Sequence, residues 1–123
     1  MLLNLSNHPS ALWSDKQKTA AEKDFKFIAD LHFPEIDPDA DELEIDKLAE
    51  EYLNIVLKKF KNLTDENNAV HLMGEHTFVF NLVTLLLKNN ITCIASTTIR
   101  KSKIIEGKKL TEFKFVKFRE YSL

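Results

Sequence analysis

Apolar and polar positions along the chain follow two different periods, one typical of strands and one typical of helices. Short apolar runs bounded by turn residues predict four strands, over residues 2–5, 27–31, 69–73 and 92–95. Apolar residues at helical spacing predict three helices, over residues 14–24, 41–61 and 75–89. Polar and apolar side chains alternate over residues 111–121, which predicts a fifth strand.

The order of these elements is strand and helix in alternation, with one additional strand at the end. No helical pattern separates the fourth strand from the fifth, so the fifth is expected to return antiparallel to it. This order predicts an α/β fold, a three-layer α/β/α sandwich around a mostly parallel, Rossmann-like sheet with a C-terminal antiparallel strand. A ferredoxin-like α+β sheet is the alternative, and the third helix–strand unit argues against it.

Length and composition narrow the class of protein further. A chain of 123 residues fits a single domain covering residues 1–123, and two glycines and three prolines leave only short loops. No apolar run is long enough to span a membrane, and residues 1–5 lack the pattern of a signal peptide. The one cysteine, Cys93, excludes an intrachain disulfide and a cysteine metal cluster. We therefore expect a cytoplasmic protein with no membrane partner.

Charge is unevenly distributed along the chain. Residues 1–99 carry 9 Lys and Arg against 16 Asp and Glu, whereas residues 100–123 carry 8 against 3. A basic end on an acidic body suggests contact with an anion or a nucleic acid. Lysines that protect an edge strand from aggregation would produce the same asymmetry. The helix over residues 75–89 is apolar on nearly every side, which places it in the core or at a subunit interface.

Short polar side chains gather where three of the predicted strands end. In the expected fold these three strand ends converge on the crevice beyond the carboxyl edge of the sheet, where ligands bind in such folds. The candidate ligand-binding residues are Ser6, Asn7 and His8 after the first strand, Gly74, Glu75 and Thr77 after the third, and Ser96, Thr97, Thr98, Arg100 and Lys101 after the fourth.

The chemistry of these residue types suits a phosphate or another anion. Hydroxyl groups donate single hydrogen bonds, and a guanidinium such as that of Arg100 donates a charge-assisted pair. Gly74 permits close backbone approach, and free N–H groups at a helix start favour anions. Loop residues and solvated cations would have the same composition, so the anion site is a hypothesis.

Three of the candidates could also take part in catalysis: His8, Glu75 and Arg100. A histidine in a cleft exchanges protons near neutral pH, although His8 before a proline also suits a plain turn. Glu75 could accept hydrogen bonds from ribose hydroxyls, or it could simply complement a helix dipole. His71 lies inside a predicted strand and is interpreted as structural. No metal-ligand spacing, nucleophile elbow or Ser-His-Asp order is evident, so neither a metal nor a cofactor is expected.

Four segments together resemble small stand-alone CRISPR-associated proteins with a CARF-like (CRISPR-associated Rossmann fold) domain. The segments are residues 4–10 (NLSNHPS), 71–75 (HLMGE), 95–100 (ASTTIR) and 115–121 (FVKFREY). The resemblance implies a cytoplasmic homodimer that binds cyclic oligoadenylate, a ring-shaped second messenger of type III CRISPR systems, across its two-fold axis. It also implies that the loops after the first and fourth strands contact this ligand. Some proteins of this kind cleave the ring without a metal and are called ring nucleases.

Cleavage of such a ring fits the residues present. In metal-free cleavage of RNA-type linkages the adjacent 2′-hydroxyl attacks the phosphorus, so the protein needs to align that oxygen and stabilise charge on the phosphate. The expected function is therefore a metal-independent ring nuclease with a cyclic oligonucleotide as partner and no long nucleic acid. Two alternatives are a sensor or sponge that binds the same ligand without turnover, and a small α/β interaction protein with no nucleotide ligand.

Overall fold

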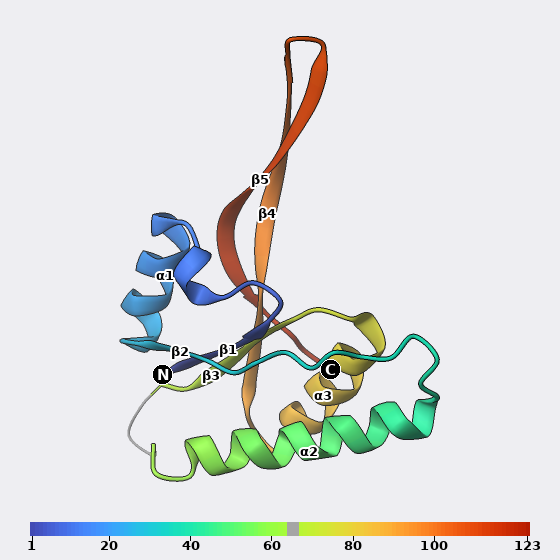
Figure 1. Ribbon diagram of the computed structural model, residues 1–123. Helices are drawn as coiled ribbons and strands as arrows, with labels where there is room; N and C mark the ends of the chain where they lie inside the picture. Colours follow the sequence, from blue (N-terminus) through green and yellow to red (C-terminus); the bar gives the residue numbers. More distant parts are fainter. Residues whose placement is uncertain (64–66) are drawn as a thin grey trace.

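The computed structural model describes residues 1–63 and 67–123, which form one five-stranded sheet with helices on both faces (Figure 1). The strands are β1 (Leu2–Ser6), β2 (Ile28–Asp30), β3 (Ala69–Met73), β4 (Thr92–Ile105) and β5 (Lys108–Glu120). Their order in the sheet is β2-β1-β3-β4-β5. The first four run parallel and β5 pairs antiparallel with β4, so the predicted α/β/α fold is confirmed.

Helices lie on both faces of this sheet, which completes the three layers. One face carries a short 3₁₀ turn, η1 (Ser10–Leu12), and α1 (Asp15–Phe25), and the other face carries α2 (Glu42–Phe60) and α3 (His76–Lys88). Each α-helix begins after a side chain that accepts hydrogen bonds from backbone N–H groups of the first turn. These N-caps are Ser14, Asp41 and Glu75. In the part of the chain that the structure describes, no helix is long and apolar enough to cross a membrane.

Alternate side chains of the strands enter two separate apolar clusters. Leu3 and Leu5 of β1 pack into the larger cluster under α2 and α3. Leu2, on the opposite face, packs into the smaller cluster under α1. The apolar residues of α3 are used mainly in the larger cluster, and Phe80, 74% exposed, is the large apolar residue that α3 leaves in solvent. Of the two alternatives for this helix, the structure therefore favours the core.

The fourth strand is much longer than its sequence pattern predicts. The prediction that it ends at Ala95 is wrong, because β4 continues to Ile105 and pairs along this length with β5. Most residues beyond Ala95 have no buried face, so they lack the alternation that marks a strand in the sequence. The pairing itself depends on residues of β5 that are distant in the sequence. The turn at Glu106 and Gly107, with φ of 51° and 76°, joins the strands in the two-residue form typical of tight hairpins.

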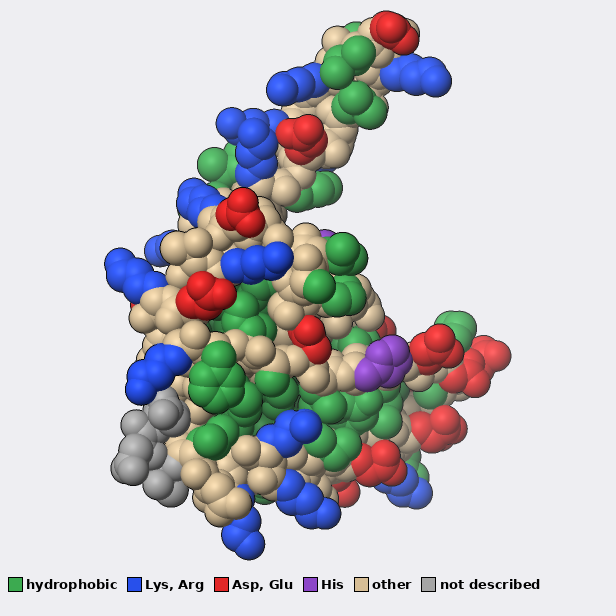
Figure 2. All heavy atoms as spheres, turned by 60° about the vertical axis from the view of Figure 1, so that its left-hand side comes forward, with side chains coloured by type: hydrophobic (Ala, Val, Ile, Leu, Met, Phe, Trp, Pro, Cys, Tyr) green, Lys and Arg blue, Asp and Glu red, His purple; other side chains and the backbone are tan. Residues whose placement is uncertain are grey.

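The outer part of this hairpin stands away from the rest of the molecule. We call residues 98–114 the arm, because every one of them is exposed and the two strands pair only with each other (Figure 1). The arm carries six Lys and Arg and two Glu. Figure 2 shows basic side chains along the arm and acidic side chains gathered on one side of the body. The charge asymmetry of the sequence is thus a spatial asymmetry.

Candidate functional site

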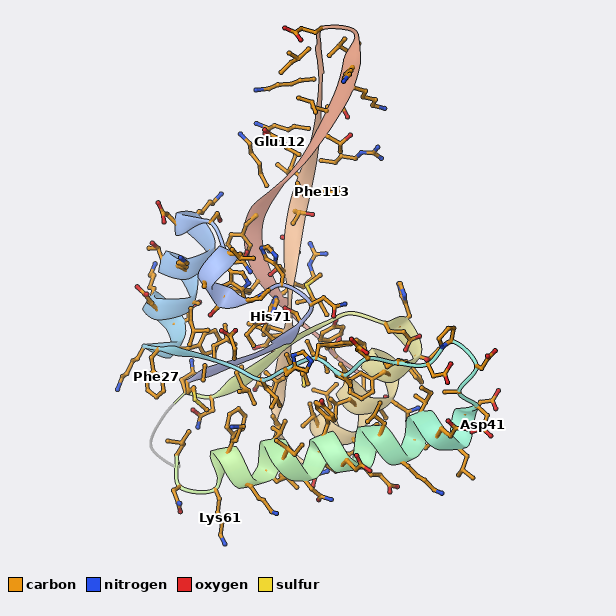
Figure 3. The ribbon with its side chains drawn as sticks, viewed as in Figure 1. Phe27, Asp41, Lys61, His71, Glu112 and Phe113 are labelled. Carbon is orange, nitrogen blue, oxygen red and sulfur yellow. The ribbon has the colours of Figure 1, made fainter. Side chains whose placement is uncertain are left out.

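The carboxyl ends of β1 and β3 lie side by side at the point where the sheet reverses its winding direction. An open cleft of about 1040 Å³ lies there, between the η1–α1 side of the body and the base of the arm. Figure 3 shows His71 near the centre of the fold and Phe113 on the hairpin beyond it. The ends of β1 and β3, the middle of β4, the start of α1 and part of β5 all contribute to the cleft wall.

The structure brings most of the predicted binding residues together at this cleft. The predicted residues that line it are Ser6, Asn7, His8, Gly74, Ser96, Thr98 and Lys101. The segment after β1 and the segment 96–101 therefore share one site, although the second segment is part of a strand and not a loop after one. Four candidates are not among the lining residues: Glu75, Thr77, Thr97 and Arg100.

The side chains of Glu75 and Thr77 form hydrogen bonds with each other and with the backbone at the start of α3. The Glu75 carboxylate accepts hydrogen bonds from the backbone N–H groups of Thr77 (3.0 Å) and Phe78 (2.9 Å), and also from the Thr77 hydroxyl (2.8 Å). Hydrogen bonds from the backbone of Phe78 and then Thr77 lower the pKa of Glu75. Of the two interpretations of Glu75, the structure favours the helix cap over a group that contacts the ligand.

The Thr97 side chain forms its hydrogen bonds within the hairpin, with the opposite strand. Its hydroxyl donates to the carbonyl of Lys117 (3.0 Å) and accepts from the N–H of the same residue (3.2 Å). The register of the two strands shifts immediately afterwards, between Thr97 and Thr98, because Val116 has no partner on β4. Arg100 lies beyond this β-bulge, in the exposed arm, beside Lys101 of the cleft.

Gly74 contacts an aromatic ring more closely than any other residue type would allow. A Cβ atom added to Gly74 would lie 2.3 Å from Cζ of Phe33, a buried residue of the larger apolar cluster. The absence of a side chain at this position thus makes room for Phe33 at the edge of the cleft. A larger residue would disturb folding as well as the cleft, so a substitution at Gly74 does not separate the two effects.

Sequence analysis missed a polar network at the floor of the cleft. Nε2 of His71 lies 2.7 Å from the Ser96 hydroxyl, and Nδ1 of His71 lies 2.9 Å from Oδ1 of Asn4. The Asn4 amide nitrogen donates to Asp30 (2.8 Å), and the Gln17 amide donates to Ser96 (3.0 Å). Five side chains from β1, β2, β3, β4 and α1 are therefore connected. The signal available in the sequence was a single polar residue inside each of three apolar strands.

Burial and neighbouring groups shift the pKa values of two members of this network. Burial, and to a smaller extent the charge of His8, lowers the pKa of His71 from 6.5 to about 4. Burial would raise the pKa of Asp30, but hydrogen bonds from Asn4 and Ser10 outweigh it and the pKa is lowered. At neutral pH the network therefore contains a neutral imidazole and an ionised carboxylate.

The rest of the cleft combines cations with aromatic rings. Its cationic side chains are Lys16, Lys101 and Lys114, and within residues 1–63 and 67–123 no Asp or Glu lines it. Its aromatic lining residues are Phe113, which is exposed, and Trp13 and Phe115, which are buried. Cations suit phosphate groups, and flat rings suit stacked bases, a combination found where proteins bind single-stranded nucleic acid. Among the described side chains, no three His, Cys, Asp or Glu form a group that could hold a metal ion.

Fold and cleft together define a three-layer α/β protein with a polar network and cations at the switch point of its sheet. The family model of the Uncharacterized protein MJ1673 family matches residues 1–119, and the chain belongs to this family. Comparison with curated proteins and comparison with solved structures each found no match.

Proposed function

We propose that this protein is a CARF-like ring nuclease that binds cyclic oligoadenylate in the cleft and cleaves it without a metal. The observation that carries the proposal is the cleft itself. Ser6, His8, Ser96 and Lys101, from segments far apart in the sequence, line one open volume of about 1040 Å³. The volume of this cleft is much larger than that of a single phosphate and suits a ligand of several nucleotides.

The charges and rings of the cleft support a nucleotide ligand. Three lysines with no carboxylate among the described lining residues favour an anionic ligand over a cationic or neutral one. Phe113, 67% exposed, offers a stacking surface of the kind that is worth about 1–3 kcal/mol per base in single-strand binding, and the buried Trp13 and Phe115 make the wall beside it apolar. The Thr98 hydroxyl adds a polar group at the wall, whereas the Ser6 hydroxyl donates a hydrogen bond to Oδ1 of Asn4 (2.8 Å).

A homodimer is part of the proposal, and the arm is the surface that we assign to it. Five large apolar side chains of the arm are at least half exposed: Ile99, Ile104, Ile105, Leu110 and Phe113. A two-stranded hairpin is marginally stable in water by itself, so contact with another protein surface would stabilise an arm of this length. Residues 35–44 carry six Asp and Glu, all exposed, and no Lys or Arg. The arm points away from this segment of its own chain, so a second copy supplies the complementary charge (Figure 1).

A sensor that binds the ring without cleaving it is the second candidate. Of the three predicted catalytic residues, only His8 lines the cleft, whereas Glu75 caps α3 and Arg100 lies in the arm. This observation favours binding over turnover by the residues that the sequence singled out. Product formation distinguishes the two candidates.

The test is incubation with cyclic tetra-adenylate and cyclic hexa-adenylate in the presence of EDTA, with affinity measured by calorimetry and products by mass spectrometry. Lys101→Ala and Arg100→Ala form a matched pair, because the residues are adjacent but only Lys101 lines the cleft. We expect Lys101→Ala to weaken binding by about 1.5–3 kcal/mol, the value of a charge-assisted hydrogen bond, and Arg100→Ala to weaken it less. Binding without linear products would support the sensor and exclude the nuclease. No binding of either ring would overturn the proposal.

A further inference from the structure

We propose that Ser96 and His71 form a proton relay, in which the Ser96 oxygen accepts the proton of the attacking 2′-hydroxyl and passes its own proton to Nε2 of His71. This inference rests on the proposed function and names the base that performs it. It assigns the role to a residue that the sequence placed inside a strand, and not to His8 or Glu75.

The direction of each hydrogen bond in the network follows from Asp30. An ionised carboxylate only accepts, so the group of Asn4 that faces Asp30 at 2.8 Å is its amide nitrogen. The same nitrogen donates to the carbonyl of His8 (3.0 Å). The Asn4 oxygen therefore faces His71, and it can bond to Nδ1 of His71 only if Nδ1 carries a proton.

A neutral imidazole has one N–H, so the proton on Nδ1 leaves Nε2 as an acceptor. The Ser96 hydroxyl, 2.7 Å away, then donates to Nε2. Ser96 accepts from the Gln17 amide at 3.0 Å, which uses one of its two lone pairs. The remaining lone pair is available to the cleft, which both Ser96 and His71 line. Toward a ligand, Ser96 is therefore an acceptor, which suits the O–H of a ribose and not the oxygen of a phosphate.

The arrangement matches the geometry of an activated hydroxyl. A hydroxyl within hydrogen-bond reach of a base, with the base oriented by a third group, is the signature of proton abstraction in many enzymes. Here the three members are Ser96, His71 and Asn4, with distances of 2.7 Å and 2.9 Å. Trp13 packs edge-on against the His71 ring at 5.1 Å between centroids, and Phe118 does so at 5.8 Å, so two neighbouring aromatic rings fix its orientation.

The 2′-oxygen forms a bond to the adjacent phosphorus while its proton moves to Ser96 and the Ser96 proton moves to His71. The bond from phosphorus to the 5′-oxygen breaks, and this oxygen takes a proton from water in the open cleft. The products are a linear strand with a 2′,3′-cyclic phosphate and a free 5′-hydroxyl, and His71 returns its proton to solvent.

The low basicity of His71 is compatible with this role. Burial disfavours the imidazolium, which keeps His71 neutral and ready to accept a proton. A bound phosphate places negative charge beside the ring and stabilises the imidazolium that forms during the reaction. The base thus becomes stronger when the ligand arrives.

The experiment combines nitrogen NMR of the free protein with single-turnover cleavage of cyclic tetra-adenylate. In the NMR spectrum of protein labelled with ¹⁵N-histidine, we expect His71 at pH 7 to carry its proton on Nδ1. In the cleavage assay, we expect Ser96→Ala and His71→Asn to lose about 100-fold or more of the rate, in the range that general base catalysis contributes, with affinity changed less than tenfold. Ser122→Ala, the same change at an exposed residue that does not line the cleft, is the control and should cleave as the wild type does.

Each outcome decides the inference. A proton on Nε2 of His71, or a wild-type rate in Ser96→Ala, would overturn the relay while leaving the ring nuclease intact. Wild-type protein that binds the ring but forms no product would also overturn the relay and leave the sensor, whereas no binding would remove the proposed function and the relay together. If His71→Asn fails to fold in thermal denaturation, Ser96→Ala carries the test alone, because removal of a half-buried hydroxyl is a smaller change than replacement of a buried ring.

Discussion

The hairpin of β4 and β5 consists of two regions with the same hydrogen-bonding pattern and different surroundings. In the inner region, Ile94 and Phe118 pack into the apolar cluster under α1, and Ser96 joins the polar network. In the arm, the same two strands continue with every side chain exposed. Backbone pairing thus sets where the strands run, whereas helix packing on the sheet sets where they are stabilised.

The boundary between the two regions is also the edge of the candidate site. The β-bulge after Thr97 separates Ser96, at the floor of the cleft, from Thr98 and Lys101 at its wall. A bulge bends the strand and increases its local twist. The site is therefore built from a rigid floor in the sheet and a wall that belongs to the base of the arm.

The largest expected effect comes from two isoleucines of the same strand. Ile94 is 3% exposed and Ile104 is 79% exposed. We expect Ile94→Ala to lower the free energy of unfolding by about 2–4 kcal/mol, because it leaves a cavity under α1. Ile104→Ala should change it by less than about 0.5 kcal/mol in dilute protein. Urea denaturation measures both.

The same pair of variants tests the arm as a dimer surface. If a second copy covers the arm, Ile104→Ala should shift sedimentation toward the monomer, and Ile94→Ala should not do so while it remains folded. Equal loss of stability in the two dilute variants would contradict the distinction between inner region and arm.

The second prediction concerns acid. The pKa of His71 is about 4 in the folded protein and 6.5 in an ordinary environment, so between these values the unfolded chain binds a proton that the folded protein does not. The contribution of neutral His71 to the free energy of unfolding is therefore complete above pH 6.5. It falls by on the order of 3 kcal/mol as the pH decreases toward 4. The arm contains no histidine, so this loss belongs to the body.

His71→Asn provides the control for this prediction. Urea denaturation of the variant from pH 7 to pH 4 should lack the histidine contribution, so that its stability falls less steeply than that of the wild type. Asp30 and Glu75, whose pKa values are lowered, lose their contributions at lower pH in both proteins. Parallel curves for the two proteins would mean that His71 is not buried as a neutral base.

The smallest expected effect is at the boundary. Thr97→Val preserves the β-branched shape but removes the hydroxyl that bonds both backbone groups of Lys117. We expect a loss of about 1–2 kcal/mol in the free energy of unfolding, the cost of leaving such groups without their partner. Hydrogen exchange should show faster opening of the arm. Unchanged exchange at Lys117 would indicate that the backbone pairs without help from the side chain.

The helices and the parallel sheet with its antiparallel last strand were predictable from local patterns. Ser14 and Gln17 stand at the spacing of a helix start, and Asp41 precedes a long amphipathic segment, so both helix starts are encoded within a few residues. The arm could not be found in this way. Its strands bury nothing in this chain, and a strand without a buried face leaves no period in the sequence.

The candidate site was predictable in outline but not in its chemistry. The segment containing Ser6 and His8 and the segment containing Ser96 and Lys101 were assigned to one cleft, which they line. The roles depend on contacts across strands. Asn4 pairs in register with His71, and Ser96 lies two residues beyond Ile94, the partner of His71 on β4. Such alignment is decided by sheet register, which three separate sequence segments do not reveal.

Trp13 offers an optical view of these events. It is the one tryptophan of the sequence, its indole N–H donates to the carbonyl of His8 at 3.1 Å, and its ring lies against His71 in the cleft wall. Because an imidazolium quenches indole emission and a nucleotide bound beside the indole alters it, the intrinsic fluorescence of the unlabelled protein should report both the arrival of a ligand and the charge on the neighbouring ring.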